Sequence, residues 1–445
     1  MARPRQPARD QSRPRPGGLP PARVRSLARR VVEKRARYRA PRRRHRASRE
    51  FTIESALEER TPDRVEERQV ALVHDYLVFL RGAERTFGAI AGLWPQAPIY
   101  TTAYSARATD RRFAGREIHA SWLRWLRPRR PTLPFLLPLY PAAVESLQLG
   151  GHRLVVSSSF SFAHGVRADP EAVHVCYCHT PFRYAWHERE AALARTPRPL
   201  RRPLARTLER IREWDARAAS RVTRYVANSR LTQERIERFY GRGAEVVHPP
   251  VDVARFQPAP PGAIGDHLLL VGELVAHKRP ELALEAARRS GCAIKVVGGG
   301  PERRRLQRLY GQSADFLGRI GDRELAELYA RALALVVPGV EEFGIVSVEA
   351  QAAGRPVIAL ADSGAAECVA DGETGVLVDR ADVDAFASAM RDVDYRAFDP
   401  AAARANAERF ALPRFQASFR AAVTRALAAG AAPVGEEPWA GAARR

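Results

Sequence analysis

The sequence predicts an α/β protein built from two doubly wound parallel-sheet domains of the Rossmann type with a cleft between them. Three observations predict this class. Apolar runs of strand length alternate with segments of helical length along most of the chain. A Pro- and Gly-rich stretch at residues 255–265 divides the alternation into two series. The length of 445 residues fits two domains.

The first series begins near Gln69 with the apolar strand run 70–76, and a helix from Gly82 to about Trp94 follows it. Further strands are expected at 98–104, 153–159, 174–179, 224–229 and 244–250. Helices are expected around 183–194, 203–220 and 231–240. Because strands and helices alternate, we expect one parallel sheet covered by helices on both faces.

The second series alternates in the same way. Its strands are expected at 267–272, 292–297, 315–318, 333–337 and 356–360. Its helices are expected at 280–290, 302–311, 322–332, 383–392 and about 413–428, with a short helix that Gly354 ends. The predicted divisions are a disordered basic tail at 1–68, domains at 69–257 and 262–395, helices at 396–430 that pack back toward the first domain, and a flexible tail at 431–445.

The positive charge is concentrated at the N-terminus. The formal net charge is +23, from 73 Lys and Arg against 50 Asp and Glu. Residues 1–50 hold 18 basic residues and three acids, which leaves 55 against 47 for the other 395 residues. The basicity is therefore mostly a property of the tail and says little about the substrate of the folded domains.

Residues 1–50 are rich in Arg, Pro and Ala and cannot bury enough apolar surface to fold. We favour a disordered, solvated tail. Attraction to anionic lipid headgroups is the alternative, which would give the protein a peripheral contact with a membrane. Nucleic acid is not expected as a partner, because no nucleic-acid-binding motif accompanies the charge.

The cysteines indicate a reducing compartment. None of the pairs among Cys176, Cys178, Cys292 and Cys368 has the C-x-x-C spacing of a zinc or redox site. No apolar run reaches the ~18 residues that span a bilayer. The Arg- and Pro-rich N-terminus has no apolar core of a secretory signal. We therefore expect a cytoplasmic protein.

The most informative stretch is the start of the short helix in the second domain. Glu341 precedes Phe343–Ile345, which open the helix, and Glu349 lies on it. The first N–H groups of a helix have no internal partner and favour an anion, and Gly344 lets backbone approach one closely. A diphosphate fits, with Glu341 and Glu349 accepting hydrogen bonds from nearby hydroxyls. The alternative is that both acids cap the helix or pair with Lys278 or an arginine.

Several segments carry a resemblance to a known family. They are Ala71–Asp75, Cys176–Trp186, Ala227–Arg230, His248–Asp252 and the two glutamates separated by seven residues. Together they resemble glycosyltransferase family 4, retaining enzymes of the GT-B fold, in its mannosyltransferase-like subgroup of polysaccharide biosynthesis. The resemblance covers residues ~69 to ~430. It implies that 69–257 is the acceptor domain and that 262–395 is the nucleotide-sugar donor domain.

The resemblance also implies roles for residues. Glu341 would contact the donor sugar, the amides of Phe343–Ile345 the diphosphate, and Glu349 the nucleotide ribose. Lys278, with Arg279, would neutralise the departing diphosphate. Gly299 would lie beside the nucleotide base.

Two positions depart from the family pattern. Many members carry an arginine five residues before the lysine, where this chain has Glu273. The turn at Gly82 resembles the family's Gly-Gly-x-Glu turn, but Arg81 replaces its first glycine. An acid beside a diphosphate weakens binding unless it turns away, so this chain relies on Lys278 as the main cation.

Polar residues follow the expected strands of the first domain. His179 ends a buried strand, which favours the cleft over the core, and by resemblance it lines the site near the transferred sugar. His74 and Asp75 end the first strand in the same way. Asp75 could orient a substrate hydroxyl, or hold a turn. Glu367, in a loop near the sugar, is a further sugar-contact candidate, and no Asp-x-Asp metal motif is placed in the cleft.

The segment Trp122–Arg130 interleaves two Trp and two Leu with four Arg. Aromatic and basic residues together suit a bilayer interface. The alternative is a helix whose tryptophans are buried against the sheet. The two remain equally open from the sequence.

Taken with the resemblance, these observations predict a metal-independent retaining glycosyltransferase without cofactors. It would transfer a hexose onto a glycan or lipid-linked acceptor, and the hexose we favour is mannose, with GDP-mannose as the donor. A UDP-hexose donor is one alternative. A GT-B-like protein without transfer activity, which binds polyanions or membranes, is the other.

Overall fold

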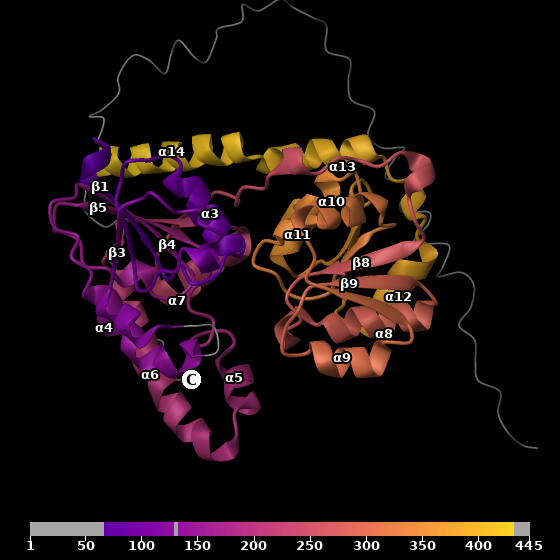
Figure 1. Ribbon diagram of the computed structural model, residues 1–445, viewed down its shortest axis with the longest axis horizontal. Helices are drawn as coiled ribbons and strands as arrows, with labels where there is room; N and C mark the ends of the chain where they lie inside the picture. Colours follow the sequence, from indigo (N-terminus) through magenta and orange to yellow (C-terminus); the bar gives the residue numbers. More distant parts are fainter. Residues whose placement is uncertain (1–65, 129–131, 431–445) are drawn as a thin grey trace, which may run out of the picture. The chain divides into compact units, whose positions relative to one another are not determined.

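The computed structural model describes residues 66–128 and 132–430, and its element labels are those of Figure 1. Residues 1–65 of the tail expected at 1–68, the tail expected at 431–445, and Arg129 and Arg130 lie outside these residues, whereas Glu67–Gln69 form a 3-10 helix. The described chain contains two parallel sheets. One has seven strands in the order β3-β2-β1-β4-β5-β6-β7, and the other has six in the order β10-β9-β8-β11-β12-β13.

The seven-stranded domain follows the predicted alternation. Its strands are β1 (Val70–His74), β2 (Ile99–Thr101), β3 (Ile118–Ala120), β4 (Leu154–Ser159), β5 (Val173–Cys178), β6 (Arg224–Ala227) and β7 (Ala244–Val246). Its helices are α3 (Gly82–Ala91), α4 (Tyr140–Glu145), α5 (Arg189–Arg195), α6 (Arg198–Ala219) and α7 (Arg230–Tyr240).

The six-stranded domain contains β8 (His267–Val271), β9 (Ala293–Val297), β10 (Ala314–Gly318), β11 (Leu335–Val337), β12 (Val357–Leu360) and β13 (Gly375–Val378). Its helices are α8 (Pro280–Ser290), α9 (Arg303–Tyr310), α10 (Asp322–Arg331), α11 (Ile345–Ala352) and α12 (Val383–Asp392), followed by α13 (Pro400–Ala407) and α14 (Leu412–Ala429). No helix of the described residues is long and apolar enough to cross a membrane.

The strand register gathers polar side chains at one edge of the seven-stranded sheet. β1, β4 and β5 are parallel neighbours, with His74 opposite Ser158. The carboxyl ends of all three strands therefore meet at the same edge. In doubly wound sheets this edge is where ligands bind.

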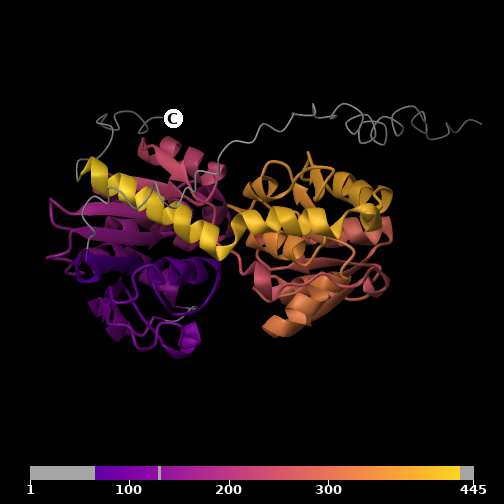
Figure 2. The same cartoon turned by 90° about the horizontal axis from the view of Figure 1, so that it is seen from above.

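Helix α14 completes the core of the seven-stranded domain although it is the last helix of the described chain (Figures 1 and 2). Phe415 and Phe419 belong to the same buried cluster as Leu72 and Tyr177. The Phe419 ring lies 5.7 Å from that of Tyr177, in an edge-on contact. α14 thus covers the face of the sheet on which Leu72 and Tyr177 lie, and the last helix is part of the first domain.

The first domain also contains elements that the sequence did not predict. β3 has only three residues, too few for a recognisable alternation. The Leu- and Pro-rich stretch forms a 3-10 helix, Leu133–Leu139, that continues directly into α4. Proline at 134 and 138 removes N–H donors, which favours this tighter, irregular winding.

We expect Phe419→Ala to lower the free energy of unfolding by about 3–5 kcal/mol, because the buried ring leaves a cavity in the core under α14. The matched control is Leu412→Ala on the same helix, whose side chain is 41% exposed. Urea unfolding followed by circular dichroism measures both. Equal losses for the two variants would contradict the placement of α14 against this core.

Candidate functional site

A tight loop precedes α11 at the carboxyl end of β11. Gly344 caps the helix with φ of 89°, and a Cβ there would lie 2.9 Å from the Cβ of Ala365, so only glycine fits. The Glu341 N–H donates to Ser363 Oγ at 2.9 Å, and the Gly364 N–H donates to the Glu341 carbonyl at 2.8 Å. These bonds hold the loop in place, and the loop in turn fixes the position of the first N–H groups of α11, which lack intrahelical partners.

Glu341 and Lys278 form an ion pair in this loop, with Nζ and Oε1 3.0 Å apart. Lys278 ends a short 3-10 helix, Ala276–Lys278, that follows β8. A small cavity beside the pair is lined in part by Gly272, Glu273 and Val346. Both charged side chains remain partly exposed, so an anion that enters the cavity can compete with Glu341 for the lysine. Arg279 follows at a left-handed position before α8 and is exposed.

Glu349 lies one turn into α11, where Tyr329 of α10 donates its hydroxyl to the carboxylate at 2.8 Å. Burial raises the pKa of Glu349 above its ordinary value. The two glutamates of the sequence motif therefore have different surroundings. Glu341 faces a cation, whereas Glu349 faces a neutral phenol.

The two departures from the family pattern meet in space. The Arg81 guanidinium lies 2.8 Å from the Glu273 carboxylate. The neighbouring Gly82 approaches the start of α11, because a Cβ on it would lie 3.1 Å from Ile345 Cδ1. Arg81 thus brings a positive charge from the seven-stranded domain to Glu273, which lines the cavity beside Lys278.

Sequence reasoning missed the role of Glu342. Its carboxylate accepts hydrogen bonds from Arg183 at 2.9 Å and from Arg235 on α7 at 3.4 Å. Although burial opposes ionisation, these two arginines hold the pKa of Glu342 below its ordinary value. Arg183 also contacts His277 Nε2 at 3.0 Å. The sequence contained a signal, because Arg183 lies in one of the family-like segments.

A row of polar side chains runs along the strand ends of the seven-stranded sheet. His179 Nε2 and His74 Nδ1 lie 2.9 Å and 3.1 Å from Ser158 Oγ. His74 Nε2 lies 3.7 Å from Glu84, which caps α3. Burial lowers the pKa of His179 to about 3, so its ring is neutral near pH 7. His74 is 1% exposed and stacks on Phe87, which makes it a support for His179 rather than a sugar contact.

Asp75 holds a turn, one of the two roles that the sequence left open. Its carboxylate accepts hydrogen bonds from the backbone N–H groups of residues 160–163 in the loop after β4. It is 1% exposed, and burial raises its pKa. With both oxygens occupied, Asp75 fixes a loop instead of meeting a substrate hydroxyl.

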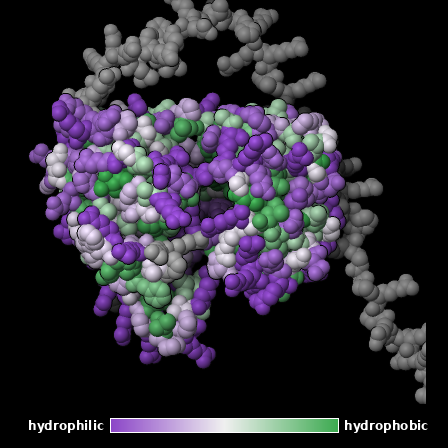
Figure 3. All heavy atoms as spheres, in the orientation of Figure 1, coloured by the Kyte–Doolittle hydropathy of each residue, from purple (hydrophilic) through white to green (hydrophobic). Residues whose placement is uncertain are grey.

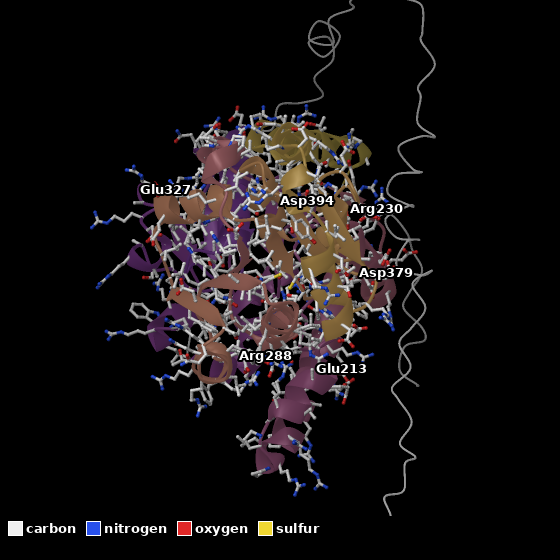
Figure 4. All side chains as sticks on the ribbon, turned by 90° about the vertical axis from the view of Figure 1, so that its right-hand side faces the viewer. Glu213, Arg230, Arg288, Glu327, Asp379 and Asp394 are labelled. Atoms are coloured by element: carbon white, nitrogen blue, oxygen red, sulfur yellow. The ribbon has the colours of Figure 1, made fainter. Side chains whose placement is uncertain are left out.

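Glu367 accepts hydrogen bonds from the Arg230 N–H, at the start of α7, and from His248 Nε2, at 2.8 Å and 2.9 Å. Figure 4 labels Arg230, with Arg288 and Glu327 as examples of the charged outer surface. Glu367 thus links the start of α7 to the segment that carries His248.

Gly299 lies in a loop that packs on the backbone of residues 272–274. The Gly299 carbonyl accepts a hydrogen bond from the Leu274 N–H at 2.9 Å. The loop therefore helps to fix the backbone next to Glu273.

Residues 265–407 match the family model of glycosyl transferases group 1. The matched residues are about a third of the chain and run through the six-stranded domain to α13. The match covers α11 and the loop before it, with Lys278, Glu341 and Glu349. The resemblance to family-4-type glycosyltransferases, inferred from the sequence motifs, is confirmed.

Curated relatives of this chain include D-inositol 3-phosphate glycosyltransferase of Streptomyces avermitilis. It is 34% identical over 261 residues, 50% of this chain and 54% of the relative. GDP-mannose-dependent alpha-(1-6)-phosphatidylinositol monomannoside mannosyltransferase of Mycolicibacterium smegmatis is 34% identical over 221 residues, 43% of this chain and 56% of the relative. The chain thus spans about half the length of the curated relatives it matches.

Solved structures share the fold of this chain. Sucrose-phosphate synthase from Thermosynechococcus elongatus superposes with a TM-score of 0.60 at 18% identity, over 81% of this chain and 99% of that chain. Anabaena HepE in complex with UDP gives a TM-score of 0.58 at 17% identity, over 80% and 99%. Together with the two parallel sheets, this likeness confirms the predicted GT-B fold.

We expect the stability of the protein to fall in acid partly through His179. Its folded-state pKa lies below the ordinary 6.5, so the unfolded chain binds the proton first as the pH falls. The contribution is fully present above pH 6.5 and declines below it. Between pH 7 and pH 5 the wild type should lose about 2 kcal/mol more than His179→Gln. Urea unfolding at both pH values measures this, and equal losses would show that His179 is not buried neutral.

Proposed function

We propose that this protein is a retaining glycosyltransferase that moves a hexose from a nucleoside diphosphate to an acceptor hydroxyl. The observation that carries the proposal is the fixed loop at the start of α11, where Glu341 and Lys278 pair beside a cavity. Such a site offers unpaired N–H groups and a cation to a diphosphate and a carboxylate to a sugar hydroxyl. The matched family model over 265–407 supports the same reading.

The donor diphosphate would lie against the first turn of α11, with Lys278 and Arg81 as its cations. Both cations are paired with acids, Glu341 and Glu273. A diphosphate carries enough charge to replace these carboxylates around the lysine and the arginine. Glu341, released from Lys278, would then turn to a hydroxyl of the donor sugar. Glu349 would accept a hydrogen bond from the ribose, as the family resemblance implies.

In the reaction the bond between the sugar C1 and the diphosphate oxygen breaks. The acceptor oxygen forms a new bond to C1 on the same face, and its proton passes to the departing diphosphate oxygen. Lys278 offsets the charge that develops on that leaving group. The neutral ring of His179 would hydrogen-bond a sugar hydroxyl, because Ser158 fixes its orientation without charging it.

We favour GDP-mannose as the donor, in line with the subgroup that the sequence resembles and with the GDP-mannose-dependent relative. A UDP-hexose is the second candidate. A glycan or a lipid-linked molecule would be the acceptor, in surface polysaccharide or glycolipid biosynthesis in the cytoplasm. We propose transfer without a metal, since α11, Lys278 and Arg81 supply the positive charge that the leaving group requires.

A protein of this fold without transfer activity was an alternative because of Glu273 and Arg81. Their ion pair weakens that alternative. The acid at 273 does not stand unpaired beside the diphosphate position, and Arg81 would supply the guanidinium that the family resemblance implies there. The two departures offset each other in charge.

We expect Glu341→Ala to lower kcat/KM for the donor sugar at least ~100-fold, through loss of the sugar hydroxyl contact. Binding of GDP alone should be kept or strengthened, because Lys278 loses a competing carboxylate. A thermal-shift panel of GDP, UDP and ADP sugars and the free diphosphates, with a transfer assay, measures both. If no nucleotide sugar stabilises the wild type, the donor-site proposal is wrong.

We expect Arg81→Glu to weaken nucleoside diphosphate binding about tenfold or more, because it replaces a cation by an acid next to Glu273. The exchanged pair, Arg81→Glu with Glu273→Arg, should restore affinity to within about threefold, since a guanidinium again borders the cavity. Isothermal titration with GDP measures all three proteins. An exchange variant no better than Arg81→Glu would show that Arg81 does not serve the diphosphate.

A further inference from the structure

Most of the large apolar side chains exposed in the described residues belong to one stretch of the seven-stranded domain. Seven of the nine lie between residues 122 and 200. The most exposed are Phe135 at 83%, Trp125 at 73% and Leu200 at 57%. Figure 3 shows apolar atoms beside charged ones on the lobe where Figure 1 places α4 and α6. The alternative of tryptophans buried against the sheet is wrong, because Trp122 and Trp125 are 41% and 73% exposed.

The exposure follows from how the segment is anchored. The 3-10 helix Trp122–Leu126 buries only Leu123, and Ser121 caps it by accepting the Leu123 N–H at 3.2 Å. Arg127 ends it in a left-handed conformation. The following 3-10 helix, Leu133–Leu139, packs Leu133, Leu136 and Leu137 on the core beside α6. The packed leucines therefore anchor both 3-10 helices to the domain, while Trp125 and Phe135 are exposed to solvent.

Arginines border these apolar side chains. Arg124 stacks over Trp125, with its guanidinium carbon 4.8 Å from the ring centre. The first turns of α6, which carry the exposed Leu200, also expose Arg198 and Arg201. Residues 195–208 hold five arginines and no acid, and the described part of 122–139 holds no acid either. The surface is thus positive and apolar at once.

We infer that this aromatic–arginine surface, formed by Trp125, Phe135, Leu200, Arg124, Arg198 and Arg201, docks the protein on an anionic lipid bilayer. Aromatic and leucine side chains enter the boundary between headgroups and acyl chains, and arginines meet lipid phosphates. Each arginine near the surface contributes about fivefold to partitioning. A protein partner fits less well, because the apolar side chains are separated by arginines instead of forming a continuous apolar patch.

The contact would hold the acceptor domain against a membrane and give it access to a lipid-linked acceptor. That last step rests on the proposed function, whereas docking itself does not. Membrane docking and the proposed function can therefore be tested separately, since vesicle binding needs no nucleotide sugar.

Flotation of the full-length protein with vesicles tests the inference. We expect binding to phosphatidylcholine vesicles with 30% phosphatidylglycerol, and at least tenfold less to phosphatidylcholine alone. Trp125→Ser/Phe135→Ser/Leu200→Ser should lower binding to the anionic vesicles at least tenfold. The matched control, Leu309→Ser/Leu412→Ser, changes exposed leucines outside this surface, with 57% and 41% exposure, and should bind as the wild type does. Circular dichroism and thermal unfolding confirm that the variants fold.

Three outcomes would overturn the inference. The wild type could fail to float with anionic vesicles, or the triple variant could float as well as the wild type, which would place binding on residues 1–50 or another surface. Equal loss in the control pair would show a general effect of exposed leucines. Self-association lost in the triple variant, without vesicle binding by the wild type, would assign the surface to a second copy of the chain.

Discussion

The carboxylate of Glu342 is the contact on which the geometry of the site most depends. Arg183 and Arg235 of the seven-stranded domain both donate to it, and it directly follows Glu341 in the loop before α11. A partly buried carboxylate needs such partners, because burial without them is costly. The same bonds that satisfy Glu342 therefore fix where Glu341 and the first turn of α11 stand relative to the strand ends that carry His179.

The sequence was sufficient for most strands of both parallel sheets and for the loop before α11. Apolar runs such as β1 and β12 are buried along their whole length, so their pattern is readable without the structure. β3 is not readable, because three residues at a sheet edge carry no alternation. Motif similarity also marked Lys278, Glu341 and Glu349, since each lies in a short segment that can be recognised along the chain.

Roles that depend on partners far along the chain were not readable. Asp75 meets four N–H groups more than 80 residues away, and Glu342 meets an arginine 159 residues away. No spacing rule links such residues. The same holds for Arg81 and Glu273. Each residue departs from the family pattern, and only the structure shows that the two form an ion pair.

Helix α14 has a consequence for the order in which the protein is made. The buried core of the six-stranded domain comes from one stretch of sequence, Val251 to Phe410, so it is complete once residue 411 has been synthesised. The seven-stranded domain starts first but lacks Phe415 and Phe419 until the final helix emerges. The domain that the ribosome begins is therefore the one that finishes last, and until then one face of its sheet stays open to chaperones or to other nascent chains.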